Sequence, residues 1–447
     1  MGRTQRLRLQ RAQQKPAEDY TSSLQNLYVH LHSLGWRNHT HLSAKNYPET
    51  GRGLCSKQDT FSPEDELIRL PVGCLITIAT LESDNEFKSL FNKDLFDKDA
   101  RISFHALVAC YLMYLKHLQD CSKTSGYAAY LDTLPSSYST PYFCAIPELQ
   151  CLPESLLERT VAQNRQIRRY YEIIKNLAGL LNCDGCGKSY DREIWTLAEY
   201  KWAYFSVNTR SVYLSSRFLK RQSNHFQTLI NGDTNMALAP FLDLFNHSDG
   251  VQTTAEIHGQ DYVLTLKSLP LAKTKTYEQL FISYGALPNF KLLTEYGFWL
   301  KENKHDYFDF SLLDIEHMIK HNKELATQTF HRNIFKFIRE HNLHDQMFVH
   351  IDDGCSHNLR VVLHLIFKQQ AYFPNILNQI AFGDAEQFED VQPELSYLVA
   401  YKIKEYEIFV GELDKLPKLT ESGSVARSYL QECIRYLAKF QLTHPAE

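Results

Sequence analysis

The sequence lacks both a long apolar run and a strong net charge. Its longest unbroken apolar run, Leu107 to Leu115, is shorter than the roughly 20 residues that a membrane-spanning helix needs. The formal net charge of the 447-residue chain is −4, so no global field attracts it to nucleic acid or to a membrane surface. No apolar segment of a signal peptide follows the arginine-rich start. With 44% apolar and 22% charged residues, we expect a globular intracellular protein of two or three domains that makes no membrane contact.

The usual metal and dinucleotide motifs are also missing. The only close pair among the ten cysteines is Cys183 and Cys186, and a structural zinc ion needs four ligands. Without a second pair, we predict a turn with two reduced cysteines and no metal site. His317 and His321 have a spacing that can bind a metal, but no HExxH glutamate accompanies them, so we interpret them as surface histidines. The Gly-Arg-Gly stretch at 51–53 lacks the GxGxxG context of a dinucleotide fold.

Positive charge gathers only at the start of the chain. The first 15 residues contain no acid, a pattern typical of a solvated, disordered tail, which we place at residues 1–22. A nuclear-import signal or a weak contact with nucleic acid are the functional alternatives for this tail. Its basic residues are Arg3, Arg6, Arg8, Arg11 and Lys15.

Strand and helix patterns alternate along the chain. After a predicted helix at 24–34, short apolar runs bounded by turn residues predict strands at 67–70 and 74–78. Helical periodicity dominates residues 83–206 and returns after residue 312. We therefore expect an α+β domain at 23–300 with a helical insertion at about 83–206, and an all-α domain at 312–447. Further strands are predicted at 207–214, 255–257, 262–266 and 280–284.

Three separated stretches carry residue types suited to a binding site. Gly51 and Gly53 flank Arg52, and glycine lets a backbone approach a ligand closely. Asn246-His247 ends an apolar segment, where buried polar side chains must find partners in each other or in a ligand. Tyr284 and Tyr296 are each followed by a glycine. Taken singly, either tyrosine could be a core aromatic residue instead of a site residue.

Taken together and in this order, these stretches resemble the SET-domain protein methyltransferases, and within them the Rubisco large-subunit methyltransferase branch. The resemblance covers about residues 24–440. It implies a SET β-fold with a helical insertion, followed by an all-α C-terminal substrate-binding domain. The supporting stretches are "GRGL", "VNTRSVYL", "LAPFLDLFNHS", "FISYG" and "EYGF".

The resemblance also implies S-adenosyl-L-methionine as the cofactor and assigns roles to individual residues. The Asn-His segment would lie in a knot-like site beside the cofactor, and Arg210 would hold the cofactor carboxylate, with an exposed ion pair as the alternative for Arg210. The resemblance implies Tyr284 and Tyr296 as the catalytic residues at the lysine channel, and no metal. The implied cofactor-binding residues are Thr50, Gly51, Arg52, Arg210, Asp243, Asn246, His247, Tyr284 and Phe298.

The resemblance predicts methylation of a protein lysine, in a histone or in another protein. A relative that methylates histidine has Asn and Trp where this sequence has Val212 and Leu242, and an apolar lining suits a lysine stem better. Protein-histidine methylation and a non-catalytic SET-like binding module remain as alternatives. We expect a monomer in nucleus and cytoplasm that contacts nucleic acid, if at all, through its basic tail.

Two features depart from the wider family. Ser248 and Asp249 follow Asn246-His247, where many members have a Pro-Asn pair. The cysteine-rich segment that follows SET in many histone-modifying enzymes is also missing. The C-terminal helical domain stands in its place, so the substrate choice of those enzymes does not transfer to this sequence.

Overall fold

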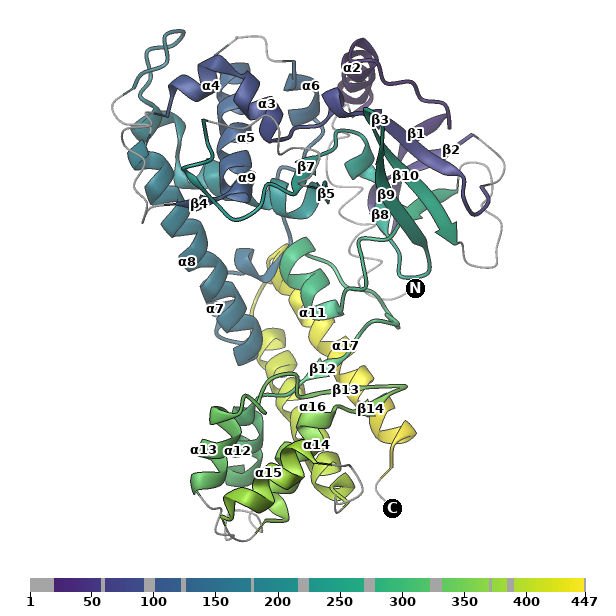
Figure 1. The fold of residues 1–447 in the computed structure, drawn as a ribbon, viewed down its shortest axis with the longest axis vertical. Coiled ribbons are helices and arrows are strands. Elements are labelled where there is room, and N and C mark those ends of the chain that lie inside the picture. Colours follow the sequence, from purple (N-terminus) through teal and green to yellow (C-terminus); the bar gives the residue numbers. More distant parts are fainter. Residues whose placement is uncertain are drawn as a thin grey trace. The chain divides into compact units, whose positions relative to one another are not determined.

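The computed structural model describes most of the chain as two compact units. The first unit is Met1–Tyr138 with Thr160–Ala286, and the second is Ser139–Arg159 with Leu287–Glu447. Because the two are separate bodies, each is described by itself (Figure 1). The predicted tail lies outside the described residues except for its end, since helix α2 already begins at Tyr20. The described residues are 20–57, 61–91, 101–121, 126–177, 181–215, 225–268, 278–321, 332–369, 372–383 and 390–445.

A four-stranded sheet of the first unit joins segments that are far apart in sequence. The order is β1-β2-β11-β8. Strand β2 pairs antiparallel with both β1 and β11, and the very short β8 runs parallel to β11. This sheet sets the glycine-rich stretch beside the end of the strand that precedes Tyr284. The strands are β1 (Leu42–Tyr47), β2 (Gly51–Ser56), β8 (Asn246–His247) and β11 (Gln279–Ile282).

The other strands of this unit form three smaller sheets. An antiparallel sheet has the order β3-β10-β9, while β4 pairs with β6 and β5 with β7. The strands predicted at 67–70, 255–257 and 262–266 are confirmed within the first of these sheets. The bounds are β3 (Glu66–Pro71), β4 (Ile102–Ser103), β5 (Ser211–Tyr213), β6 (Ile230–Asn231), β7 (Met236–Leu238), β9 (Gln252–His258) and β10 (Asp261–Ser268).

The strand predicted at 74–78 is wrong. The N–H of Thr77 donates to Thr80 Oγ1 at 3.0 Å, in a capping box that starts helix α3 at Ile78. Such a cap satisfies donors that the first turn of a helix leaves without partners. Only a single bridge at Ile76 remains of the predicted strand.

The strand predicted at 207–214 is largely wrong as well. Helix α9 continues to Arg210, and only Ser211–Tyr213 is extended. Thr196 caps this helix through its side chain, which accepts from the N–H of Glu199. Burial of Phe205 and Val207 on the last turns outweighs the weak strand preference of the local sequence.

Helices of the first unit surround an apolar centre. Helix α5 is almost fully buried, because its sequence is apolar on nearly every side. Phe87 packs its ring against Phe91, Tyr111 and Phe226, with centroids 4.9–5.7 Å apart. The helices are α2 (Tyr20–Ser33), α3 (Ile78–Ser83), α4 (Asn85–Ser89), α5 (Phe104–Asp120), α6 (Ala128–Leu131), α8 (Glu154–Leu177) and α9 (Leu197–Arg210), with shorter turns η1 (Val72–Cys74), η4 (Tyr190–Ile194) and η5 (Leu242–Leu244). The residues of α8 up to Arg159 belong to the second unit.

The second unit is mainly helical and includes a small sheet of order β12-β13-β14. It starts at Leu287, upstream of the expected position near 312, and it adds Ser139–Arg159 from the expected insertion. Glu148 explains this addition, since its buried carboxylate accepts from the hydroxyl of Thr420 at 2.7 Å. The elements are η3 (Pro141–Phe143), α7 (Ile146–Leu149), α11 (Asn289–Lys291), η6 (Leu292–Tyr296), β12 (Phe308–Asp309), α12 (Leu312–His321), α13 (Arg332–Glu340), β13 (Phe348–His350), β14 (Gly354–Cys355), α14 (His357–Phe367), α15 (Pro374–Phe382), α16 (Gln392–Lys415) and α17 (Glu421–Thr443).

Within the described ranges, no helix has the length and apolarity that crossing a membrane requires.

Candidate functional site

Asn246 links two of the predicted stretches directly. Its side-chain amide donates to the carbonyl of Arg52 at 2.9 Å, across 194 residues of sequence. The parallel pairing of β8 with β11 places Asn246 opposite Phe281 and His247 opposite Ile282. The Asn-His pair is therefore threaded between segments from the two ends of the first unit.

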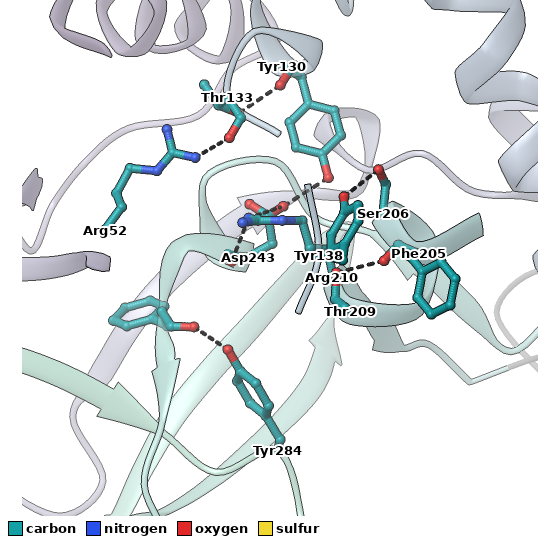
Figure 2. A network of polar contacts seen from close by, with 11 residues as sticks. Arg52, Tyr130, Thr133, Tyr138, Phe205, Ser206, Thr209, Arg210, Asp243 and Tyr284 are labelled. Atoms are coloured by element: carbon teal, nitrogen blue, oxygen red, sulfur yellow. Dashed lines mark hydrogen bonds and ion pairs between the residues drawn. The ribbon is translucent and has the colours of Figure 1, made fainter. Parts of the chain in front are cut away.

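His247 connects this segment to Tyr284. The backbone N–H of Tyr284 donates to His247 Nδ1 at 3.1 Å, and the carbonyl of Ile282 lies 3.4 Å from the same nitrogen. The two rings stack with centroids 5.0 Å apart. The Tyr284 hydroxyl donates to the carbonyl of Phe245 at 2.6 Å, which fixes the ring at the end of β8 (Figure 2).

Arg210 and Asp243 form a buried ion pair in the same unit. Arg210 Nη1 donates to the Asp243 carboxylate at 3.2 Å and to its carbonyl at 3.1 Å. The Arg210 side chain is 15% exposed and that of Asp243 only 1%, which rules out the exposed ion pair. Burial by itself lowers the pKa of Arg210, but Asp243, Tyr138 and Tyr130 together outweigh burial, so the pKa is raised. The guanidinium thus keeps its charge.

Tyr130 completes this arrangement from helix α6. Its hydroxyl donates to Asp243 Oδ2 at 2.9 Å (Figure 2). Burial and the adjacent carboxylate together raise the pKa of Tyr130 well above its usual value, so the hydroxyl remains a donor. Sequence reasoning missed Tyr130, because nothing in a spacing of 113 residues indicates that the helical insertion returns to the Asp243 segment.

The glycine-rich stretch is held close to these groups. The side chain of Thr50 donates to Gln279 Oε1 at 2.7 Å, and the guanidinium of Arg52 donates to the Thr133 carbonyl. A Cβ on Gly53 would overlap the Gln279 amide nitrogen and lie 2.9 Å from that of Asn246, so any larger residue would displace these two side chains. Gly51 has a φ of +74° at the hairpin turn, a conformation that glycine adopts without strain.

A cavity of about 440 Å³ opens beside Arg52. Its size falls within the range of small-molecule sites. The other lining residues come from α2 and β1: Leu24, Gln25, Tyr28, Val29, Ala44, Lys45 and Asn46.

Buried polar atoms indicate that this region suits a polar ligand. Among the described residues, Asp243 Oδ1 and Arg210 Nε are buried and have no hydrogen-bond partner. Leaving such atoms without partners costs about 1–3 kcal/mol each, so native structures usually supply a ligand or water. S-adenosylmethionine carries a carboxylate, an ammonium group and ribose hydroxyls that can serve such atoms. The residues present therefore fit the cofactor that the sequence resemblance implies.

The structure brings together eight of the predicted site residues in the first unit. Thr50, Gly51, Arg52, Arg210, Asp243, Asn246, His247 and Tyr284 all belong to it. Val212, on β5, and buried Leu242, on η5, belong to it too. The roles of these residues toward a cofactor and substrate stay predictions.

Tyr296 and Phe298 belong to the second unit. Their ring centroids lie 6.2 Å apart, and burial raises the pKa of Tyr296. Gly297 between them has a φ of +80°, and its carbonyl accepts from the Ser139 hydroxyl at 2.9 Å. Their predicted part in a lysine channel stays a prediction.

Comparison with known proteins gives two kinds of match. No family model matches the sequence. The chain is 26% identical to SET domain-containing protein 4 of Artemia parthenogenetica over 420 residues, which is 92% of this chain and 95% of that protein. It is 29% identical to the Mus musculus protein of the same name over 310 residues, which is 68% of this chain and 65% of that protein. It is also 24% identical to the Mus musculus actin-histidine N-methyltransferase over 269 residues, which is 58% of this chain and 40% of that protein.

Solved structures match the fold over nearly the whole chain. The SET domain of LSMT bound to lysine and AdoHcy covers 95% of this chain, with 91% of its own length covered, a TM-score of 0.59 and 16% identity. Rubisco LSMT bound to sinefungin and monomethyllysine covers 93% of this chain, with 90% of its own length covered, a TM-score of 0.55 and 14% identity. The chain thus has the SET fold, and it is a homologue of the proteins named SET domain-containing protein 4.

Proposed function

We propose that the protein is an S-adenosylmethionine-dependent protein methyltransferase that acts on lysine. The observation that carries this proposal is the contact between the Asn246 amide and the Arg52 carbonyl. It joins the threaded Asn-His strand to the glycine-rich strand. His247 extends the same arrangement to Tyr284.

The chain's own residues would bind and orient the cofactor. Arg210 and Asp243 offer a buried guanidinium and a buried carboxylate that pair with each other. Gly51 leaves open space along the backbone of β2, since a Cβ there would meet no atom within 4 Å. When bound, S-adenosylmethionine supplies a methyl group already activated by a positive sulfur.

Tyr284 would then position the acceptor. Its ring is fixed by His247 on one face and by the Phe245 carbonyl at the hydroxyl, so it needs no reorganisation to orient an amine. A free lysine has a pKa of about 10.4 and is mostly charged at neutral pH. A site beside a positive sulfur disfavours the ammonium form, so the lysine would lose its proton to water before it accepts the methyl group.

The apolar side chains of Val212 and Leu242 support lysine as the acceptor. Neither can hydrogen-bond an imidazole, whereas both can contact the stem of a lysine. The similarity to proteins named actin-histidine N-methyltransferase supports protein-histidine methylation as the second candidate. The substrate remains a histone or another protein, reached in the nucleus or the cytoplasm, and the second unit would capture it.

One experiment distinguishes these candidates. The purified full-length chain is incubated with methyl-labelled S-adenosylmethionine and a protein extract, and the labelled amino acids are separated after complete hydrolysis. We expect label in methyllysine, and much less of it when the Tyr284→Phe variant is used at matched concentration and time. Label in methylhistidine would replace lysine by histidine as the acceptor. Absence of both label and calorimetric cofactor binding would leave the non-catalytic binding module.

A further inference from the structure

A cluster of thiols and an imidazole lies in the first unit, apart from the residues described above. The ligand atoms of His117, Cys121 and Cys183 all lie within 4.8 Å of one another. The sulfur of Cys186 lies 3.6 Å from His117 Nε2. Three potential metal ligands therefore lie close together, and Cys186 adjoins them through His117. The sequence shows only Cys183 and Cys186 as a motif.

Two pieces of backbone present these ligands. His117 lies on the last turn of α5 and Cys121 follows at its end, so the two share one face at a spacing of four residues. Cys183 and Cys186 lie in a tight turn closed by the bridge between Asn182 and Ser189. The helix end and the turn are more than 60 residues apart in sequence, which is why spacing alone does not reveal the site.

Backbone hydrogen bonds close the turn that holds Cys183 and Cys186. The N–H of Gly187 donates to the Cys183 carbonyl at 2.7 Å, and the N–H of Cys183 donates to the Lys188 carbonyl at 2.8 Å. Gly187 has a φ of +71°, a conformation that lets the chain turn sharply after the second cysteine.

The distance between Cys186 and His117 agrees with tetrahedral coordination. Zinc bonds of about 2.3 Å to sulfur and about 2.0–2.1 Å to nitrogen put neighbouring sulfur and nitrogen ligands about 3.5 Å apart. The measured separation between Cys186 and His117 is 3.6 Å. His117 is only 8% exposed, and the Tyr190 ring packs edge-on against it with centroids 5.8 Å apart. The imidazole is thus held with its Nε2 towards the thiols.

We propose that His117, Cys121, Cys183 and Cys186 bind one structural zinc ion. Three cysteines and one histidine are a common closed zinc set, and with four protein ligands no coordination position is left for a substrate. Each thiol loses its proton to solvent when the metal binds. The ion would fasten the end of α5 to the turn at 182–189.

Metal content provides the first test. The full-length protein is purified without chelator from zinc-supplemented cells, and zinc is measured by mass spectrometry. We expect one zinc ion per chain, released when a mercurial reagent blocks the thiols. Replacement of zinc by Co²⁺ should give the visible bands of a tetrahedral, thiolate-rich site.

Variants locate the ion. Cys186→Ser, at the exposed ligand, should weaken zinc binding by about 100-fold or more, whereas Cys186→His keeps four ligands and should retain the ion. Cys151→Ser, which changes a cysteine of the second unit, is the matched control and should keep full zinc content.

Three results would overturn the proposal. The first is a wild-type chain with neither zinc nor a cobalt spectrum. The second is equal zinc content in wild type, Cys186→Ser and Cys183→Ser. The third is a Cys183–Cys186 disulfide in protein alkylated at the moment of cell lysis.

Discussion

Replacing Gly53 by alanine tests the packing of the glycine-rich strand against the Asn-His segment. The new methyl group would overlap the Gln279 side-chain nitrogen and lie 2.9 Å from the Asn246 amide nitrogen. Both amides are the ends of side chains and could swing away. Each is anchored, however: Asn246 by the Arg52 carbonyl at 2.9 Å, and Gln279 by the Thr50 hydroxyl at 2.7 Å.

The expected loss of stability follows from these two hydrogen bonds. Relief of the overlap breaks both hydrogen bonds, each with a net contribution of about 1 kcal/mol. We therefore expect the free energy of unfolding of the first unit to fall by about 2 kcal/mol, within the range found for overpacked sites. If the Asn246 amide must also stay in place for the cofactor, affinity for S-adenosylmethionine falls by roughly 30-fold, since about 1.4 kcal/mol is tenfold.

Urea unfolding and calorimetry measure these two effects. Three of the four tryptophans, Trp36, Trp195 and Trp202, lie in the first unit, so intrinsic fluorescence reports mainly on its unfolding. Gly73→Ala is the matched control, because its Cβ would meet no atom within 4 Å. Equal stability and equal cofactor affinity of the Gly53→Ala and Gly73→Ala variants would refute the reasoning.

Three further substitutions follow from the same contacts. Tyr284→Phe should lower kcat by about 10- to 100-fold, the loss of one positioning hydrogen bond, with cofactor affinity in calorimetry nearly unchanged; unchanged turnover would remove the hydroxyl from the reaction. Asp243→Asn should lower the free energy of unfolding by about 3 kcal/mol, because Arg210 keeps a buried charge without its counterion. Lys402→Met should destabilise the second unit by a similar amount, since Lys402 is 7% exposed and paired with Asp314 at 2.6 Å, whereas Lys415→Met, at an exposed pair, should change stability by about 0.5 kcal/mol or less.

Local sequence patterns correctly predicted those elements whose backbone conformation is determined by neighbouring residues in the sequence. The strands at 67–70, 255–257 and 262–266 are present because their apolar runs pair with each other in one sheet. The prediction failed at 74–78 and 207–214, where helix capping by Thr77 and burial of the α9 face determine the backbone. Such competition is invisible in a short window of sequence.

Local sequence also fails to predict which side chains meet, both in the Arg210–Asp243 ion pair and in the cluster of His117 with the cysteines. The sequence singled out Asp243 and Arg210 separately, but their pairing and its link to Tyr130 depend on how α6 and α9 pack. In the same way, one cysteine pair was visible at 183–186, while His117 and Cys121 join it only through the position of α5.

The sequence by itself indicated the SET fold, through its resemblance to the SET-domain methyltransferases, and it singled out the Asn-His and glycine-rich stretches, because each of them is a run of contiguous residues. Only the tertiary structure decided that Asn246 contacts Arg52, that Tyr130 serves Asp243, and that His117 faces the cysteine turn. Each of these contacts joins residues dozens to hundreds of positions apart. Their proximity is set by the burial of apolar helix and sheet faces, which is a property of the whole unit and not of any segment.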